Sequence, residues 1–496
     1  MMNLTVNTQY GQVKGFEDDG LNKWFGIPFA APPVGELRFK RTQPCTPWEG
    51  VKETTKFSPA PYQFMAPMAK NAPEPEQSED CLYLNVWAPK NAEKCPVFVW
   101  IYGGANASGM ANDPAYDGTS FAKNGVVYVT FNYRVGPLGF YNFSIYDERF
   151  DSNCGVADQI AALRWVKENI ANFGGDPENI TIAGESAGGT AVYDMLAAPS
   201  AKGLFKRAIA QSGLASSACE HPRTAKLNVD LYLDKLGIPS GDLSKLLEMK
   251  PEEMKPAALW LMAENNRHYP GIFVPGPVKD DLIPEYPWEA MAKGSAEGVD
   301  VIFGSNHDEG TLFIMMKMFP ISWEEIETML KNNGYEHKLP EFKRLYAAKK
   351  EKTSAELVAR DRAFWADYVR CADAQSKHAK VYAYRFDFAT TMLKLMGLGA
   401  MHSAEISHVL NTNGAMTQMF SKLTSKKRIA KFRQITHNAW ISFCKTGDPN
   451  GAHLPFPWET YDEATRTTYI FNDKCSVEHN PNGEFYELWK DMFLYE

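Results

Sequence analysis

The sequence predicts an α/β fold, in which a mostly parallel central sheet is covered by helices on both faces. Two observations predict it: apolar runs rich in β-branched and aromatic residues recur along the chain, and segments with helical periodicity separate them. Strands of a parallel sheet are buried on both faces, so their sequences are apolar almost throughout rather than alternating. Six runs have this character: residues 95–104, 125–136, 179–186, 207–213, 299–306 and 381–388.

The helical segments differ in length, and we expect them to differ in role. Residues 158–173 carry apolar side chains at helical spacing and are short enough to connect two strands. The intervals 214–298 and 307–380 are too long to be plain loops, so we expect helical insertions that cap the ligand-binding edge of the sheet. No repeat or linker composition divides the sequence, which predicts a single domain over residues 1–496.

Charge and composition narrow the classes of partner. The 496 residues include 52 basic and 60 acidic side chains, a net charge of −8, without long blocks of one sign. This balance argues against a nucleic-acid binder, which relies on clustered Lys and Arg. The N-terminal sequence lacks a signal-peptide pattern and no apolar run reaches eighteen residues, so we expect no association with membranes.

The stretch GESAG (184–188) places Ser186 between two glycines, after a predicted strand and before a predicted helix. Glycines at these two positions permit the sharp turn of a nucleophile elbow, and the helix N-terminus directs amide hydrogens toward the serine oxygen. We therefore interpret Ser186 as a nucleophile. The alternative is that Ser186 is only a small residue in a tight strand-to-helix junction.

A serine nucleophile needs groups that stabilise the oxyanion formed during the reaction. Residues 100–109 form a glycine-rich loop after an apolar strand, so backbone N–H groups can turn toward a ligand there. The candidate donors of an oxyanion hole are the N–H groups of Gly104, Ala105 and Ala187. The alternative is an ordinary glycine-rich strand end.

Stretches along the whole chain resemble the type-B carboxylesterase and cholinesterase family of α/β-hydrolases, and in character its bacterial para-nitrobenzyl-esterase-like carboxylesterases. The resemblance implies an α/β-hydrolase fold with long insertions, which agrees with the predicted sheet. The matching stretches are residues 26–44, 78–89, 100–109, 131–140, 173–189, 208–213, 304–313, 401–410 and 440–450.

The resemblance also implies the partners of Ser186. In NHDEG, Glu309 matches the acid that orients the base, and in MHSAEISHV the first histidine, His402, matches the base itself. The chain order of serine, acid and histidine is the order that this fold uses. Neighbouring residues offer alternatives: Asp308 for the acid, and His307 and His408 for the base.

Other matches concern residues that support the site or the fold. Glu185, beside the nucleophile, and Ser212 match family side chains that support the catalytic serine, acid and histidine without contacting the substrate. Each could also be a polar side chain that is only packed in the core. Two ion pairs match family pairs that stabilise the structure and have no part in catalysis: Arg38 with Glu79, and Arg134 with Asp176.

The activity that the resemblance implies is that of a serine carboxylesterase. Such an enzyme hydrolyses short-chain or aryl carboxylic esters through an acyl-enzyme on the serine, and it needs neither a metal nor an organic cofactor. The expected partner is a small-molecule ester. Amidase or lipase activity on the same triad stays open, and so does a non-catalytic adhesion-type module of this fold.

Three departures from the family pattern refine these expectations, and the first concerns the cysteines. Secreted relatives pair the cysteine that Cys81 matches, but this sequence has no matching partner, so we expect reduced thiols and a bacterial cytoplasmic location. The spacing of the cysteines also fits no metal or redox motif. The eight cysteines are Cys45, Cys81, Cys95, Cys154, Cys219, Cys371, Cys444 and Cys475.

The sequence also predicts an apolar substrate cavity without a site for quaternary ammonium groups. Phe64, Met65 and Met68 occupy the region where cholinesterases have a stacking tryptophan, and Asn106 stands where the family has an aromatic residue. Methionines flank Glu309 and His402, and we expect some of them to line the cavity. They are Met315, Met316, Met318, Met392, Met396 and Met401.

Overall fold

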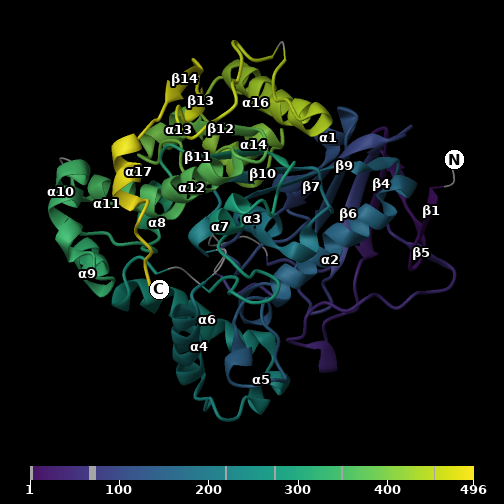
Figure 1. The fold of residues 1–496 in the computed structure, drawn as a ribbon. Helices are drawn as coiled ribbons and strands as arrows, with labels where there is room; N and C mark the ends of the chain where they lie inside the picture. The colour runs from purple at the N-terminus through teal and green to yellow at the C-terminus, as the bar shows by residue number, and fades with distance from the viewer. Residues whose placement is uncertain are drawn as a thin grey trace.

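The computed structural model describes residues 4–65, 74–217, 220–272, 275–347, 350–451 and 453–495 (Figure 1). Two residues named above, Met68 and Cys219, lie outside the described residues. The architecture is a large twisted sheet with helices on both faces, which confirms the predicted α/β fold (Figure 1). Its eleven strands follow the order β14-β13-β12-β11-β10-β9-β7-β8-β6-β4-β3.

The six predicted apolar runs form the parallel centre of this sheet. Each pairs in parallel with its neighbours among the six, and β13 (Thr467–Phe471) extends the parallel part beyond them. Carboxyl ends of parallel strands meet at one edge of a sheet, so the residues that follow these strands come together there. The six are β7 (Cys95–Ile101), β8 (Val127–Phe131), β9 (Gly175–Glu185), β10 (Arg207–Gln211), β11 (Asp300–Asn306) and β12 (Val381–Phe386).

The pattern of apolar runs did not predict several strands, because they are short or interrupted by polar residues. The buried strand β4 (Leu21–Pro28) contains Asn22 and Lys23, and the Lys23 amine emerges to pair with Asp18 at 2.6 Å. The others are β3 (Phe16–Asp18), β6 (Tyr83–Pro89) and β14 (Ser476–His479) in the main sheet, and β1 (Thr5–Thr8), β2 (Gly11–Lys14) and β5 (Val51–Glu53) in a separate small sheet.

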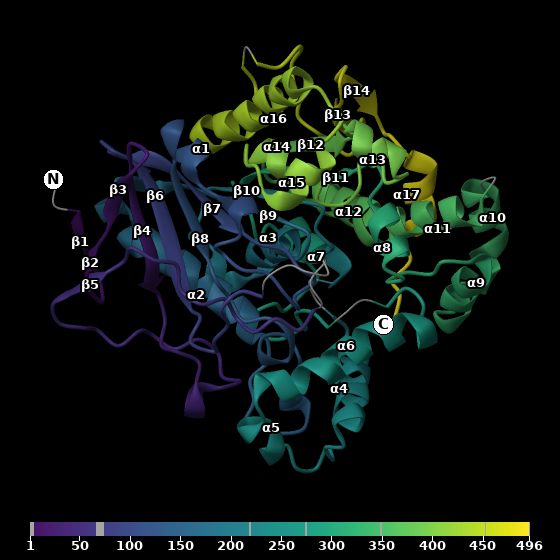
Figure 2. The ribbon, with the colours of Figure 1, turned by 180° about the vertical axis from the view of Figure 1, so that it is seen from behind.

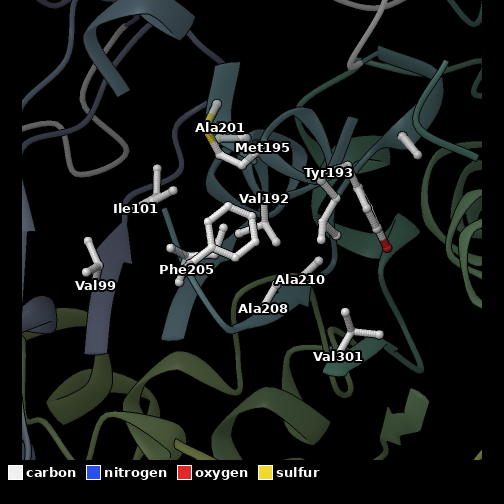
Figure 3. Close-up of a cluster of buried hydrophobic side chains, with 14 of the residues drawn as sticks. Val99, Ile101, Val192, Tyr193, Met195, Ala201, Phe205, Ala208, Ala210 and Val301 are labelled. Atoms are coloured by element: carbon white, nitrogen blue, oxygen red, sulfur yellow. The ribbon is translucent and has the colours of Figure 1, made fainter. Parts of the chain in front are cut away.

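Alternate residues of β7 divide the core into two layers. Val99 and its neighbours at alternate positions pack with α2 (Cys154–Asn169) and α3 (Ala187–Ala197) on one face of the sheet. Phe98 and Trp100 pack on the other face with α16 (Lys426–Thr446). Figure 3 shows Val192 and Met195 of α3 among Val99, Ile101, Ala208 and Ala210 of the strands. The predicted helix at 158–173 is therefore α2, which begins four residues earlier, with a short 3-10 turn at Ile170–Phe173.

The long intervals are helical, as predicted, but they do not act only as caps. Helices α4, α5 and α6 form a lobe below the sheet in Figure 2, and α9, α10 and α11 lie together at one side. Helices α7 and α12 instead pack in the layer that covers the sheet. Their bounds are α4 (Pro222–Leu236), α5 (Ser244–Glu248), α6 (Pro251–His268), α7 (Pro287–Ala292), α8 (Gly310–Met315), α9 (Trp323–Asn332), α10 (Leu339–Tyr346), α11 (Glu351–Arg360) and α12 (Ala366–Gln375).

The seven cysteines that the structure describes are free thiols, and five of them are buried. Across the described helices, none combines the length and apolar character required to cross a membrane.

One of the two predicted ion pairs is wrong. Arg38 pairs with Glu79 at 2.7 Å as expected, but Arg134 pairs with Asp158 of α2 rather than with Asp176. Arg134 follows the carboxyl end of β8, whereas Asp176 lies at the amino end of β9, so the two occupy opposite edges of the parallel sheet. The sequence match could not reveal this because it carries no information about which edge a residue reaches.

The corrected pair yields a stability prediction. Both partners are buried, and Asp158 accepts hydrogen bonds from Arg134 and from the Thr42 hydroxyl at 2.6 Å. Asp158→Asn leaves a buried guanidinium without its counter-charge and should lower the free energy of unfolding by about 3–5 kcal/mol. The measurement is urea denaturation. The matched control Asp176→Asn should change it by less than about 1 kcal/mol, because the only contact of Asp176 with the described residues is a local turn contact with the Glu178 amide; equal effects of the two variants would contradict this pairing.

Candidate active site

Ser186 lies at a constrained junction between β9 and α3. Its backbone has φ 59° and ψ −125°, outside the regions that side-chain-bearing residues normally occupy. A Cβ at Gly184 would lie 2.3 Å from the Gly188 carbonyl oxygen, and one at Gly188 would lie 2.1 Å from the Ile101 carbonyl oxygen. The two glycines are therefore required by close backbone packing, and the resulting turn presents Ser186 to the cavity described below.

His402 and Glu309 meet behind this junction. The imidazole Nδ1 lies 2.6 Å from Glu309 Oε2, and both side chains are buried. Because a carboxylate only accepts hydrogen bonds, Nδ1 donates, and in the neutral ring the lone pair lies on Nε2. The other oxygen, Glu309 Oε1, accepts from the Ser212 hydroxyl at 2.5 Å and from the Asn306 amide at 2.7 Å. These contacts fix the carboxylate, and one of them comes from Ser212, which the sequence analysis named as a supporting side chain.

The neighbouring alternatives lie elsewhere. Asp308 binds the ring of His307 at 2.9 Å and accepts from the Ala400 amide at 2.8 Å, so its carboxylate holds a loop rather than His402. His408 lies on the cavity wall among phenylalanine rings, without an acidic partner among the described residues. Among the described histidines, only His402 combines a buried carboxylate partner with a position on the wall of the cavity that Ser186 lines.

Three buried glutamates surround His402. Glu185 Oε1 lies 3.2 Å from His402 Nε2 and accepts from the Ser403 hydroxyl at 2.6 Å. Among the described residues, Nε2 itself has no hydrogen-bond partner. Glu405, which the sequence analysis missed, accepts from Asn306 Nδ2 at 2.6 Å and from Gln211 Nε2 at 3.2 Å.

This cluster perturbs each of its titratable groups. Burial raises the pKa of Glu185 to about 8, although the positive charge of His402 opposes the shift. Burial also raises the pKa of Glu405, and Glu309 adds to the effect. For His402, burial favours the neutral form, but the carboxylates of Glu185 and Glu309 outweigh it and raise the pKa to about 9. The protonated imidazole is thus strongly stabilised in this site.

Two phenylalanine rings fix the plane of the His402 ring. The centroids of Phe313 and Phe364 each lie 4.9 Å from the imidazole centroid. Phe313 belongs to α8, directly after Glu309, and Phe364 belongs to a π-helical turn at Asp361–Trp365. The apolar spacing of a helix gave no signal for this role, because it does not distinguish ring contacts from ordinary core packing.

The loop after β7 turns sharply beside Ser186. Gly104, Ala105 and Asn106 have positive φ values of 128°, 55° and 53°, and the Gly104 carbonyl accepts from the amides of two later residues in the turn. A Cβ at Gly103 would lie 2.9 Å from the Ser186 Cβ, so this loop approaches the serine as closely as backbone allows. Ala187, the third predicted donor, is the first residue of α3.

Asn106 does not face the cavity. Its side chain is buried, and the side-chain nitrogen Nδ2 lies near Gly276. Its backbone carbonyl accepts a hydrogen bond from the Gly136 amide at 2.6 Å. The departure from the family's aromatic residue therefore leaves the described lining of the cavity unchanged. Phe64 likewise packs in the core against Gly136, whereas Met65 lines the cavity.

A cavity of about 490 Å³ opens over Ser186, His402, Gly104 and Ala105. Of the six methionines expected near it, three line it and three do not. Met315 and Met396 are 55% and 52% exposed to solvent, and Met392 is half-buried outside the cavity. No tryptophan lines the described part of this cavity. The methionines that line it are Met65, Met110, Met316, Met318, Met401 and Met416.

The described side chains do not form a recognisable metal-binding site. No group of three or more His, Cys, Asp or Glu residues among them is arranged to hold a metal ion.

Comparisons with known proteins agree over nearly the whole chain. The model of the carboxylesterase family matches residues 2–489. Para-nitrobenzyl esterase of Bacillus subtilis (strain 168) is 37% identical over 98% of each chain, and phenmedipham hydrolase of Pseudarthrobacter oxydans is 31% identical over 95% of each. A solved thermophilic PNB esterase has 34% identity and a TM-score of 0.88, over 98% of this chain and 100% of that one. The chain therefore belongs to the carboxylesterase family, has the α/β-hydrolase fold and is a carboxylic ester hydrolase.

Proposed function

We propose that the protein is a serine carboxylesterase that hydrolyses short-chain and aryl esters through an acyl-enzyme on Ser186. The observation that carries this proposal is the meeting of three elements at one cavity: the glycine-flanked Ser186, the His402–Glu309 pair and the loop at Gly104. The carboxylesterase relatives named above support the same reaction class.

The reaction proceeds by acyl transfer in two steps. Ser186 Oγ attacks the ester carbonyl while His402 Nε2 takes its proton, and the imidazolium then protonates the departing alcohol. A water molecule then attacks the acyl-enzyme, again with His402 as the base, and the carboxylic acid is released. Glu309 holds the imidazole by Nδ1 and stabilises its positive charge, as the 2.6 Å contact requires.

The negative charge that develops on the carbonyl oxygen needs hydrogen-bond donors already in place. We assign this role to the N–H groups of Gly104, Ala105 and Ala187, and the N-terminal end of α3 adds a positive potential. Each donor contributes on the order of 3 kcal/mol to the transition state.

His402 is a better base than His408. Burial, followed by the charges of Arg433 and Arg428, lowers the pKa of His408 to about 3, so its neutral ring is a very weak base. His402 has a raised pKa and a carboxylate that holds its ring. Glu185 and Ser212 assist by stabilising the charged imidazole and the Glu309 carboxylate.

The largely apolar, methionine-rich cavity supports neutral esters with short or aryl groups as substrates. The names of the bacterial relatives, a para-nitrobenzyl esterase and a phenmedipham hydrolase, fit aryl substrates. Amidase or lipase activity is less well supported. An adhesion-type module has no need of a serine, a base and an acid around one cavity.

We also infer that residues 1–496 act as one domain and that the protein is cytoplasmic. The main sheet contains strands from both ends of the chain, which supports a single folding unit. The free thiols of the described cysteines, five of them buried, support a reducing compartment.

The first activity prediction concerns the nucleophile and the base. Ser186→Ala and His402→Ala should each lower kcat for p-nitrophenyl acetate by about 10⁴- to 10⁶-fold, with circular dichroism unchanged. Because the two residues act in one step, the double variant should be no slower than either single variant. Near-parental activity of Ser186→Ala, or multiplication of the two losses, would refute the assignment.

The second prediction concerns pH. The carboxylate of Glu185 raises the pKa of His402, so Glu185→Gln should lower it. The base must be neutral to act, so the acid limb of the kcat/KM profile should move to lower pH in this variant. Glu220→Gln is the matched control: its carboxyl is also buried with its pKa raised to about 8, but it contacts Asn228 rather than His402. A limb that stays or moves to higher pH in Glu185→Gln would exclude this coupling.

The third prediction concerns substrate class. We expect kcat/KM to be higher for p-nitrophenyl butyrate than for p-nitrophenyl palmitate, butyrylthiocholine or p-nitrobutyranilide. The cavity offers methionine side chains and no tryptophan among the described lining residues, so it discriminates weakly among small apolar groups. Preference for the palmitate ester would indicate a lipase, preference for the anilide an amidase, and preference for the thiocholine ester a cation site.

A further inference from the structure

His408 is a buried polar group that the proposed mechanism does not use. It lies in α14 (Ile406–Val409), is 5% exposed and lines the same cavity as Ser186 and His402. Neither ring nitrogen has a hydrogen-bond partner among the described residues; Nδ1 is fully buried, so Nε2 is the nitrogen that a ligand in the cavity can reach. An unpartnered buried polar group costs free energy in the folded protein, so such a group on a cavity wall points to a ligand.

The ring of His408 is held in place by aromatic neighbours. Its centroid lies 5.1 Å from that of Phe388, 5.2 Å from that of Phe432 and 5.9 Å from that of Phe386. Phe388 and Phe432 are themselves stacked at 4.0 Å with only 9° between their planes. The imidazole is therefore fixed in orientation within an aromatic part of the cavity wall.

The imidazole is also neutral in this environment. Burial and the charges of Arg433 and Arg428 keep its pKa far below the ordinary value. Both guanidinium groups are engaged elsewhere: Arg428 pairs with Asp473 at 2.6 Å, and Arg433 donates to Asn413 at 2.8 Å. A neutral ring offers one donor and one acceptor, so it recognises an uncharged hydrogen-bonding group rather than an anion.

The cavity wall around His408 favours an aromatic ligand. The Phe388 ring contacts His408, and Leu393, Ile406 and Phe420 also line the cavity. The nearby Thr390 hydroxyl is already used, since it donates to the Phe420 carbonyl at 2.6 Å. A flat ring packs well against such side chains, and a polar substituent on that ring meets the imidazole.

We propose that His408 forms a hydrogen-bonding subsite that selects esters whose aryl group carries an uncharged hydroxyl. This inference rests on the proposed esterase function, which supplies the reaction but not the selectivity. A hydroxyl both donates and accepts, so it pairs with either tautomer of the neutral imidazole. A methyl group of the same size leaves the ring nitrogen unpaired.

The test compares two isosteric ester pairs. One pair varies the acyl half: methyl 3-(4-hydroxyphenyl)propanoate and methyl 3-(4-methylphenyl)propanoate. The other varies the alcohol half: 2-(4-hydroxyphenyl)ethyl acetate and 2-(4-methylphenyl)ethyl acetate. The parent protein should prefer the hydroxyl ester in the pair whose aryl group reaches His408. His408→Phe should lower that hydroxyl-to-methyl ratio of kcat/KM by about ten- to a hundredfold, because it removes the hydrogen bond and keeps the ring.

Two measurements separate a subsite from a merely structural role. If His408 only packs, His408→Phe changes both members of a pair alike and leaves the ratio unchanged. Thermal unfolding checks the fold, and the phenyl variant should be at least as stable, since it replaces an unpartnered polar group by an apolar ring. His408→Gln retains hydrogen-bonding atoms and should keep part of the selectivity. A change of less than fivefold in the ratio for both ester pairs would overturn the proposal.

Failure of the underlying esterase function gives a different result. In that case Ser186→Ala retains hydrolysis, whatever His408→Phe does. Calorimetric binding of 2-(4-hydroxyphenyl)ethanol and 2-(4-methylphenyl)ethanol to Ser186→Ala tests the alcohol-side subsite without any chemistry. Tighter binding of the hydroxyl compound, lost in the Ser186→Ala/His408→Phe double variant, supports the subsite even then.

Discussion

The parallel arrangement of β7, β9, β10 and β11 is the constraint on which the site depends. Their carboxyl ends meet at one edge, so the residues that follow them converge although they are far apart in the sequence. The loop at Gly104 follows β7, Ser186 follows β9, Ser212 follows β10 and Glu309 follows β11. His402 joins them because Asn306, at the end of β11, binds the Met401 carbonyl at 2.8 Å.

Close backbone packing at this edge makes the geometry rigid. Gly184, Gly188 and Gly103 each occupy positions where a Cβ would lie within 3 Å of neighbouring backbone atoms. The serine is thus fixed by main-chain contacts rather than by its own side chain. The same edge concentrates charge, since Glu185, Glu309 and Glu405 are all buried around one imidazole. Hydrogen bonds from Ser212, Ser403 and Asn306 offset part of the cost of burying these carboxyl groups.

Much of this arrangement was predictable from particular residues. The features that were not predictable from the sequence have identifiable physical causes. Glycines around Ser186, between an apolar strand and a helix, indicated the elbow from local sequence alone. Glu309 and His402 required family resemblance, because no local pattern reveals which distant side chains converge. The predicted Arg134–Asp176 pair failed since sequence matching does not distinguish the two edges of a sheet. Glu405 and the ring contacts of His402 depend on tertiary packing, which neither periodicity nor motif spacing encodes.

The most direct test of the account is covalent labelling with a fluorophosphonate, followed by peptide mass spectrometry. The activated serine should attack the phosphorus, which should leave one phosphonyl group per chain, on the peptide that contains Ser186. Labelling should disappear in Ser186→Ala and fall sharply in His402→Ala, because the hydroxyl then lacks its base. Ester hydrolysis that continues with Ser186 unlabelled, or labelling at another serine that abolishes activity, would contradict the account.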